Sequence, residues 1–519
     1  MEDQKNQTAT NQGRTSRLSA RVAIAVFLAL LIITSAGVSW SLSNAKLKTF
    51  SSTWAWDLAY FNHSFWLATH GGDTLTINPW GTNAYGLFSC EGPSPWKRTH
   101  FQPVLLMQLP FYRLWPTTQG LLAMQCLLVA LGVLPIYGIA RLISGSAVVA
   151  LLLAALYAFD VHWLMVAQND FRPISISVTF YLATAYFLLN GRIAFAILVA
   201  VGVVSCREEM AFVLLVLSIP VWFYHRRQAM NKRLLLSAIP PAVAVLAWLA
   251  QLVYFRLVYD AWIGLPVNEM AASDVFLDRI IAMLTTARPQ NLLAIAAPQY
   301  WVIMLFIPWT DLLANPQISS LDCQAQYWQY WVPHLIGSAL CVTVGAGWIW
   351  AQVRRRWAGA ERLVTIGLAL LVLSQGISYA RSAGQLHRAV AARQTPFRQL
   401  LWSMSQMLPP ETAVTAPQEL IAPFSSRRRI TTWSRPPVIS PGYFFREPYL
   451  VAENRVSALK KTDVLIVSRK ERKAIAGAGE VGMTLLTDGD DWLVFVSPAY
   501  FSLLEDWLAS VDYPKSNGP

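Results

Sequence analysis

The sequence is poor in charge. Only 13% of its 519 residues are Asp, Glu, Lys or Arg, whereas 55% are hydrophobic and the mean hydropathy is +0.39. An ordinary soluble domain carries about 25% charged residues. The shortage of charge therefore excludes a typical soluble protein. It indicates an α-helical polytopic membrane protein whose main partner is the lipid bilayer.

Acidic residues are the scarcer charged type. The 29 Asp and Glu against 41 Lys and Arg give a net charge of +12. Such an excess can indicate nucleic-acid binding, but these basic residues fall largely in short clusters between apolar runs. That distribution is what the orientation of membrane proteins by positive loops requires. We therefore expect no nucleic acid among the partners.

Motifs of several enzyme classes are missing. The five cysteines are widely scattered, so neither a zinc site nor a disulfide framework is expected. The sequence also has no glycine-rich phosphate loop and no nucleophile elbow. A nucleotide-sugar donor used at the cytoplasmic face would need a nucleotide-binding domain there, whereas a lipid-phosphate donor needs only a membrane groove and an outer site. These absences favour a lipid-linked donor.

The N-terminal part predicts the orientation of the chain. Residues 1–21 are polar and basic and precede an apolar run at 23–40, close to the roughly 20 residues that a spanning helix needs. We expect a cytoplasmic tail at 1–21 and an uncleaved anchor, rather than a signal peptide cut near 41–45. A large first extracytoplasmic loop follows at 42–118. Its Pro-broken apolar segment at 100–115 predicts an interfacial helix.

Apolar runs separated by basic residues continue to residue 380, so that 22–380 forms the polytopic membrane domain. The segment at 291–320 predicts a broken or re-entrant pair, and 160–173 a short outer loop. We expect about 11 membrane segments in a multi-pass protein of the plasma or inner membrane. The other runs after the anchor lie at 119–140, 143–159, 174–190, 193–206, 210–225, 234–256, 332–351 and 363–380.

The last 139 residues, 381–519, are no longer membrane-like and predict a small extracytoplasmic α/β domain. Helical spacing at 396–408 precedes short runs that are typical of strands, at 427–433, 463–469 and 483–497. The last of these runs predicts a hairpin with an Asp-Gly turn.

The alternation of spans places several ionisable residues on the extracytoplasmic side. They are Asp57, His100, Asp170 and the triplet Arg207-Glu208-Glu209. An acidic group at the membrane boundary is costly to dehydrate, so it needs a partner or a task. For Asp57 the task would be that of a general base toward an acceptor hydroxyl or amine. The alternative is that Asp57 caps a helix that starts at Leu58.

The other candidates have similar pairs of interpretations. Glu208 or Glu209 could hold a divalent cation such as Mg or Mn, or a sugar hydroxyl, and Arg207 could bind phosphate; a tight turn with a local ion pair explains the same triplet. His100 and Asp170, in HFQP and DFRP, could line a polar pocket or simply begin helices.

Tyr330, in YWQYWVPH at 327–334, is a candidate substrate contact. An aromatic belt at the membrane interface explains the same segment.

The chain resembles a family of prokaryotic polytopic proteins catalogued as domain of unknown function 2079. That family is similar to the GT-C glycosyltransferases, which include protein O-mannosyltransferases and the aminoarabinose transferase of lipid A. The segments that carry the resemblance are WDLAYFNHSFW, HFQPVLLMQLPFYRLWP, DFRP, REEMAF and YWQYWVP.

The resemblance implies a GT-C-like fold with Asp57 as the catalytic base. It also implies a polyprenyl-phosphate sugar donor, whose phosphate would be met by groups such as Arg207 or His100. The family pattern DFHPE appears here as DFRPI at 170–174. A metal site that relies on the lost His and carboxylate is in doubt, and Arg172 could serve as a phosphate contact instead.

The sequence therefore predicts an integral membrane glycosyltransferase that moves a sugar from a polyprenyl-phosphate donor to an extracytoplasmic lipid, glycan or protein. A transporter or lipid flippase is the first alternative, because ionisable groups beside a broken helix are also typical of carriers. The second is a non-catalytic envelope scaffold. In a scaffold, Asp57 and the Glu pair would be replaceable at little cost.

Overall fold

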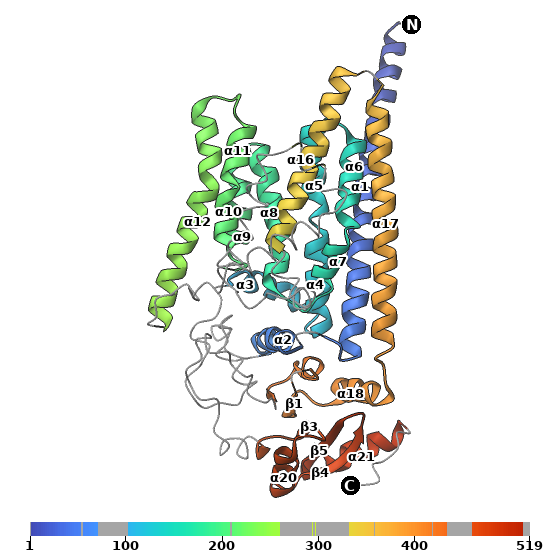
Figure 1. Ribbon diagram of the computed structural model, residues 1–519, viewed down its shortest axis with the longest axis vertical. Coiled ribbons are helices and arrows are strands. Elements are labelled where there is room, and N and C mark those ends of the chain that lie inside the picture. Colours follow the sequence, from blue (N-terminus) through green and yellow to red (C-terminus); the bar gives the residue numbers. More distant parts are fainter. Residues whose placement is uncertain are drawn as a thin grey trace, which may run out of the picture.

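A bundle of long helices makes up most of the molecule, and a small α/β domain lies against one end of it (Figure 1). We call that end of the bundle the domain end and the opposite end the basic end. The N-terminus lies beyond the basic end and the C-terminus lies in the α/β domain. The computed structural model describes residues 2–52, 55–70, 102–207, 210–259, 293, 296, 332–357, 359–417, 419–432 and 459–511.

The helices of the bundle follow the apolar runs of the sequence. Five helices of the described chain are long and apolar enough to cross a membrane, or six with one bent pair. The pair expected at 291–320 lies outside the described residues, apart from Leu293 and Ala296. The bundle helices are α1 (Glu2–Lys48), α4 (Thr118–Ala130), α5 (Val133–Ser144), α6 (Ala147–Ala158), α7 (Val161–Ala167), α8 (Pro173–Leu189), α9 (Ile193–Val204), α10 (Met210–Val216), α11 (Ser218–Tyr224), α12 (Met230–Tyr259), α16 (Val332–Arg356) and α17 (Glu361–Ala391).

The centre of the bundle is packed with aliphatic and aromatic side chains, while its periphery is equally apolar. Val133, Ile136 and Tyr181 are fully buried. On α17, by contrast, Leu363 and Leu373 are 71% and 60% exposed. Exposed apolar faces of this extent suit helices that are surrounded by lipid rather than by water.

The bent pair corrects the prediction of an outer loop at 160–173. Helices α6 and α7 meet at a bend of 51° after a break of only a few residues, and α7 packs within the bundle core through Trp163 and Val166. The segment is helical because Asp160 caps it, accepting a hydrogen bond from the N–H of His162 at 2.8 Å. Only 168–172 remain as a turn before α8.

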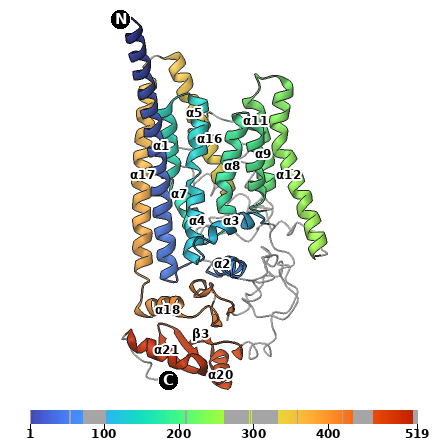
Figure 2. The same cartoon turned by 180° about the vertical axis from the view of Figure 1, so that it is seen from behind.

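Two of the predicted domain boundaries fall inside helices. Helix α1 continues to Lys48, past the predicted start of the outer loop at 42, and α17 continues to Ala391, past the predicted domain start at 381. In both cases the polar residues that follow the apolar run continue the same helix. Both helices reach the α/β domain in Figure 2.

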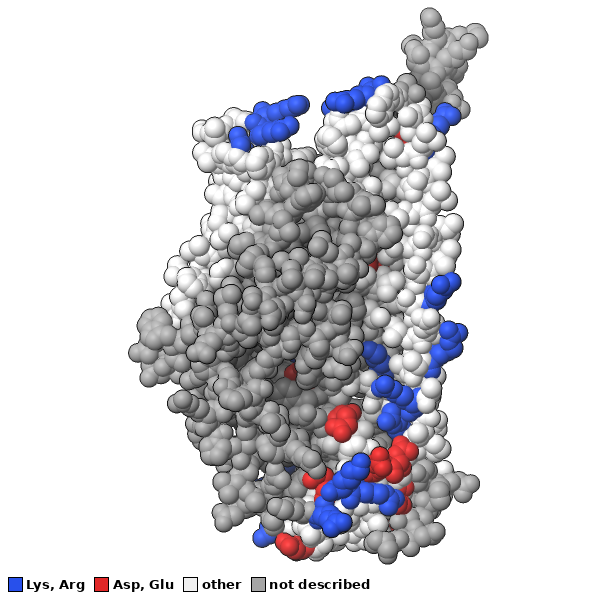
Figure 3. Space-filling model, viewed as in Figure 1, with Lys and Arg blue, Asp and Glu red and all other residues white. Residues whose placement is uncertain are grey.

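Basic side chains gather at the end of the bundle far from the α/β domain (Figure 3). Below them lies a band with few charges, and charges of both signs return around the α/β domain. The clusters at the basic end come from the loop between α11 and α12, from the first turn of α12 and from the last turn of α16. They comprise Arg226, Arg227, Lys232, Arg233, Arg354, Arg355 and Arg356.

Two short helices lie across the domain end, α2 (Ala55–Thr69) and α3 (Val104–Tyr112) (Figures 1 and 2). Helix α3 confirms the short helix expected within 100–115. It buries Val104 and Leu105, while Phe111 remains 64% exposed. Helix α2 lies between the bundle and the α/β domain.

The α/β domain contains a five-stranded mixed sheet in the order β2-β1-β3-β5-β4. Strands β1, β2 and β3 pair in parallel, and β5 pairs antiparallel with both β3 and β4. The elements are α18 (Pro396–Met407), β1 (Val414–Ala416), the 3₁₀ helix η6 (Ala422–Phe424), β2 (Ile430–Thr432), β3 (Val464–Ser468), α20 (Arg472–Glu480), β4 (Thr484–Gly489), β5 (Trp492–Val496) and α21 (Pro498–Ser510).

The predicted helix and strands of this domain are present, with one shift in the hairpin. Gly489 pairs with Trp492, so the connecting residues are Asp490 and Asp491 rather than the predicted Asp-Gly pair. Asp490 adopts a φ of 49°, a left-handed conformation that Asp tolerates better than most residues.

Candidate active site

Helix α2 places Asp57 at the domain end of the bundle. The helix begins at Ala55, so Asp57 lies in its first turn and does not cap a helix that starts at Leu58. A negative charge is favourable there because it faces the positive end of the helix dipole. The rest of α2 is fixed by packing: Leu58 is fully buried, and the rings of Phe61 and Phe171 meet edge to face at 5.3 Å.

The turn between α7 and α8 is held by one buried amide, that of Gln125 on α4. Its nitrogen donates to the carbonyl oxygens of Ala167 at 3.2 Å and Asn169 at 3.0 Å, and its oxygen accepts from the backbone N–H of Arg172 at 2.7 Å. Pro173 then starts α8 with a φ that already suits a helix. The orientation of this irregular turn is therefore set by a side chain from another helix.

Arg172 leaves this turn toward α2, and its guanidinium forms an ion pair with the carboxylate of Asp57. The two side chains are 20% and 14% exposed. The pair is therefore shielded from most of the solvent, where charges interact more strongly than in water. A guanidinium has five N–H donors, so it can contact a carboxylate and an anionic ligand together. The pair orients the carboxylate of Asp57.

A second acidic residue lies in the same turn. Asp170 is only 4% exposed, and Lys46 in the last turn of α1 interacts with it electrostatically. Both acids of the site thus have a basic residue close by, supplied by a different part of the chain.

Arg207 lies in the turn between α9 and α10. That turn is joined to α3 by a hydrogen bond from the N–H of Val104 to Ser205 O at 3.1 Å. Cys206 also packs with Val104 and Ile176. Arg207 is therefore at the same end of the bundle as Asp57 and Arg172.

Four of the predicted site residues, His100, Glu208, Glu209 and Tyr330, lie outside the described residues. The divalent-cation site predicted for Glu208 or Glu209 lies there too. Among the residues that the structure does describe, no group of three or more His, Cys, Asp and Glu side chains could hold a metal ion.

The face of α2 that points away from the bundle is hydrogen-bonded to the α/β domain. Asn62 is fully buried and donates to the hydroxyls of Ser425 at 2.8 Å and Ser426 at 3.0 Å, while its oxygen accepts from the hydroxyl of Tyr112 at 2.8 Å. The helix that carries Asp57 is thereby fixed to the domain below it.

His63 lies beside Asn62 in this contact and is also fully buried. Burial lowers its pKa from 6.5 to about 4; the nearby charge of Arg427 also lowers it, whereas backbone hydrogen bonds to Ser425 and Arg427 oppose the change. Burial lowers the pKa of Arg427 as well, to about 10. At neutral pH the contact therefore contains a neutral imidazole beside a guanidinium charge.

Sequence reasoning missed several residues of this site. Gln125, Lys46, Asn62 and His63 were not among the predicted residues. Gln125 carried a usable signal, because a large amide inside the apolar run LLAMQCLLVA is costly unless it is hydrogen-bonded. The pairing of Arg172 with Asp57 had no such signal in the sequence, since it joins positions 115 residues apart.

The chain matches a family model described as "Predicted membrane protein (DUF2079)" over residues 46–436. No curated protein matches it in sequence. In structure it is similar to ArnT from Cupriavidus metallidurans bound to undecaprenyl phosphate, with a TM-score of 0.56 and 13% identity over 91% of this chain and 98% of that one.

The apo structure of the same ArnT gives a TM-score of 0.56 and 14% identity over 93% of this chain and 99% of that one. The family match spans more than half of the sequence, and the structural likeness extends over nearly the whole of both chains. The chain therefore belongs to the DUF2079 family of predicted membrane proteins, and its fold is that of the GT-C glycosyltransferases.

Proposed function

We propose that the protein is an integral membrane glycosyltransferase that moves a sugar from a polyprenyl-phosphate donor to an extracytoplasmic lipid, glycan or protein. The observation that carries the proposal is the shielded ion pair between Asp57 and Arg172 at the domain end. It occurs in a fold whose solved neighbour binds a polyprenyl phosphate.

The charge distribution supports an extracytoplasmic site. Basic clusters gather at the end of the bundle opposite Asp57, and cytoplasmic loops are the ones enriched in Lys and Arg. The α/β domain and the candidate site then face the outside of a plasma or inner membrane. A polyprenyl-phosphate donor is available at that face without a nucleotide.

The chemistry requires a base and a group that receives negative charge. As the acceptor hydroxyl or amine attacks the anomeric carbon, its proton passes to Asp57 and the bond from that carbon to the phosphate oxygen breaks. The leaving polyprenyl phosphate gains one negative charge, and the fixed guanidinium of Arg172 is suited to stabilise it. The ion pair thus contains both groups that the reaction needs.

The same geometry suggests an order of events. Without donor, Arg172 holds the carboxylate of Asp57. When the donor phosphate enters, it offers the guanidinium a second anion, so part of the contact moves from Asp57 to phosphate. The carboxylate is then free to receive the proton of the acceptor. Arg207 and His100 are further candidate phosphate contacts, Asp170 and Tyr330 candidate sugar contacts, and Glu208 or Glu209 a candidate site for Mg or Mn.

Transfer by the purified protein in lipid tests the proposal. A panel of radiolabelled polyprenyl-phosphate sugars is incubated with a membrane extract as acceptor, and Asp57→Asn is compared with the natural sequence. Asparagine keeps the size of the side chain but cannot act as the base. We expect at least a 100-fold loss of transfer, in line with the usual contribution of a general base.

A matched control removes the carboxylate of a different Asp–Arg pair. Asp488→Asn disrupts the pair of Asp488 with Arg469 on the surface of the α/β domain and should leave transfer unchanged. An Asp57→Asn protein that is folded and still transfers sugar at the natural rate would refute the role of Asp57. If no donor of the panel yields a product, the glycosyltransferase proposal itself fails.

A further inference from the structure

Helix α17 turns one side away from the bundle over its whole length. Its buried residues are Leu368, Tyr379 and Val390, and each follows the one before by about three turns of helix. They mark the line along which α17 packs. Leu370 and Ile377 lie on the opposite side and are 60% and 55% exposed. In a membrane this opposite side contacts lipid, and we call it the lipid-facing side of α17.

The lipid-facing side changes from apolar to basic toward the domain end. No Asp, Glu, Lys or Arg occurs at 363–380, whereas Arg381 and Arg388 follow and are both exposed. Arg381 comes four residues after Ile377 and seven before Arg388, spacings that keep all three on one side of a helix. Basic side chains are visible along this edge of α17 in Figure 3, between the band with few charges and the α/β domain.

The place of Arg381 along α17 matches a membrane surface. The helix begins at Glu361, and the 20 residues from there to Arg381 correspond to about 30 Å. The hydrocarbon core of a membrane is also about 30 Å thick. When Glu361 lies at one surface of the core, Arg381 therefore lies at the other. Arg388 is about 10 Å further along the axis, in the headgroup layer, where lipid phosphates lie.

Both guanidinium groups lack an acidic partner among the residues that the structure describes. Helix α17 contains no Asp or Glu after Glu361. The end of α1, which packs beside this part of α17, contributes Lys48, a further exposed basic residue. A surface of one charge sign without counter-charges attracts ligands of the opposite sign.

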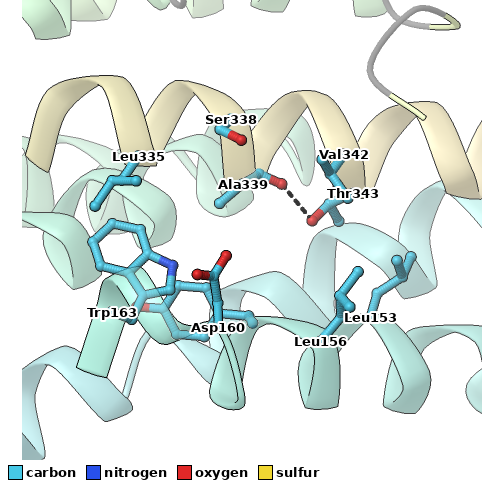
Figure 4. A pocket seen from close by; sticks show the side chains of 10 residues that line it. Leu153, Leu156, Asp160, Trp163, Leu335, Ser338, Ala339, Val342 and Thr343 are labelled. Atoms are coloured by element: carbon cyan, nitrogen blue, oxygen red, sulfur yellow. Dashed lines mark hydrogen bonds between the residues drawn. The ribbon is translucent and has the colours of Figure 1, made fainter. Parts of the chain in front are cut away.

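The acidic residue beside the packed side of α17 is Asp160, because its neighbour Phe159 meets the ring of Tyr379 at 5.8 Å. Its carboxylate points toward α16 in Figure 4, into a cavity between α6 and α16. It also accepts a hydrogen bond from the N–H of His162 at 2.8 Å. Asp160 therefore faces the interior of the bundle and does not neutralise Arg381 on the far side of α17.

Gly384 leaves open space between the two guanidinium groups. It lies three residues after Arg381 and four before Arg388, and it is exposed. A Cβ atom added there would meet no atom within 4 Å. Glycine weakens the interior of a helix, but it lets another group approach the backbone closely. A headgroup over Gly384 would have one arginine a helical turn away on either side.

We propose that the lipid-facing side of α17 binds an anionic phospholipid, with its phosphate over Gly384 and its acyl chains along Ile377 and Leu370. Arginine donates paired hydrogen bonds to phosphate oxygens, and basic groups at the membrane surface attract anionic lipids. A free phosphate would gain nothing from the apolar part of this side, whereas a lipid contacts both parts. The site is separate from Asp57, so it does not depend on the glycosyltransferase proposal.

The test counts lipids bound to the full protein by native mass spectrometry in a neutral detergent. Phosphatidylglycerol is titrated, and phosphatidylcholine with the same acyl chains is titrated in parallel. We expect Arg381→Gln and Arg388→Gln each to weaken one phosphatidylglycerol binding event about fivefold, as expected for the loss of one basic group at a membrane surface. The double variant should lose that event, while phosphatidylcholine binding stays unchanged in all variants.

Two further variants separate the site from the net charge. Gly384→Leu keeps both guanidinium groups but fills the space between them, and should weaken the same binding event several-fold. Arg472→Gln removes an exposed basic residue from α20 of the α/β domain, and should leave phosphatidylglycerol binding as it is.

A phosphatidylglycerol with a photoreactive headgroup, incorporated into nanodiscs with the protein, locates the bound lipid. Cross-links should fall on the peptide that covers 377–391. Cross-links confined to the basic end, or unchanged phosphatidylglycerol binding in the double variant, would overturn the proposal.

Other occupants of this side of α17 give different results. Displacement of the lipid by an equal concentration of inorganic phosphate would show a site for free anions. A dimer that dissociates in Gly384→Leu would show that a second copy of the chain covers this side. Either result would overturn the lipid proposal. If the double variant does not fold, Gly384→Leu decides the matter, because an unchanged phosphatidylglycerol affinity in that variant excludes this site.

Discussion

The side-chain oxygen of Gln125 accepts a hydrogen bond from the backbone N–H of Arg172 at 2.7 Å. Through this bond, helix α4 sets the position of the residue that pairs with the candidate base Asp57. The positions of the two charges of the site thus depend on a neutral amide, which binds the backbone of Arg172 rather than its guanidinium.

Replacing Gln125 by Leu should impair transfer and stability together. The change keeps much of the volume but leaves the carbonyl of Asn169 and the N–H of Arg172 without their partner, which we expect to cost about 2–4 kcal/mol of unfolding free energy. The displaced turn should also lower kcat at least tenfold at saturating donor. Gln119→Leu, which removes one amide of the same helix and its bond to Asn44, should lower kcat less than twofold. Equal losses of kcat in both variants would contradict a positioning role for Gln125.

Replacement of Arg172 should separate binding from the charge of the pair. Arg172→Lys keeps one positive charge but loses the forked donors, so we expect the KM for the donor to rise about tenfold with a smaller change in kcat. Arg172→Gln should lower kcat as well, because the guanidinium that stabilises the leaving phosphate is then lost. Steady-state kinetics against donor concentration measure both effects. An unchanged KM in both variants would exclude Arg172 as a phosphate contact.

Acidification should weaken the contact between α2 and the α/β domain. His63 has a pKa of about 4 in the folded protein against 6.5 for an exposed histidine, so between these values the unfolded chain binds more protons. Folding stability must then fall as the pH decreases from about 6.5 to 4, by about 3 kcal/mol in total. Thermal unfolding at a series of pH values measures the slope.

The comparison that isolates His63 uses two variants of the same helix. His63→Gln cannot be protonated and should flatten the acid limb of the stability curve, whereas His70→Gln, at the exposed end of α2, should leave it as it is. An acid limb of the same steepness in His63→Gln would show that other groups cause it.

Cysteine labelling should show that the two ends of the molecule lie on opposite sides of the membrane. In a background with Cys90 and Cys323 replaced by Ser, Ala229→Cys lies at the basic end and Ala509→Cys lies in the last turn of α21; both positions are exposed. A membrane-impermeant maleimide applied to intact cells should label only Ala509→Cys, and permeabilised cells should show both. Labelling of Ala229→Cys alone would reverse the proposed orientation and remove the site from the outer face.

The sequence determined the class and much of the layout because those depend on local patterns. A helix in lipid must satisfy its own backbone hydrogen bonds, so each apolar run of adequate length, such as those of α1, α12 and α16, predicts its helix directly. Alternating strands flanking Asp and Gly likewise predicted the β4–β5 hairpin. Of the family segments, WDLAYFNHSFW contributes Asp57 and DFRP contributes Arg172, and these two residues meet at the domain end.

Where local signals were weak or contradictory, the prediction failed. Strand β1 has three residues, too few to show an alternation. Helix α7 has only seven residues, between Asp160 and the polar segment 168–170, so its sequence predicts an outer loop, whereas packing against the bundle makes it part of the core. Short elements of this kind are fixed by what surrounds them, not by their own propensity.

By itself, then, the sequence determined a polytopic helical membrane protein with an α/β domain and a set of ionisable residues that return to one end. The tertiary structure decided which of them meet: Arg172 with Asp57, and Gln125 with the turn that carries Arg172. It also decided that Asp160 faces a cavity. Periodicity reports only which side of its own helix a residue occupies, whereas contacts between residues more than a hundred positions apart arise when the helices pack.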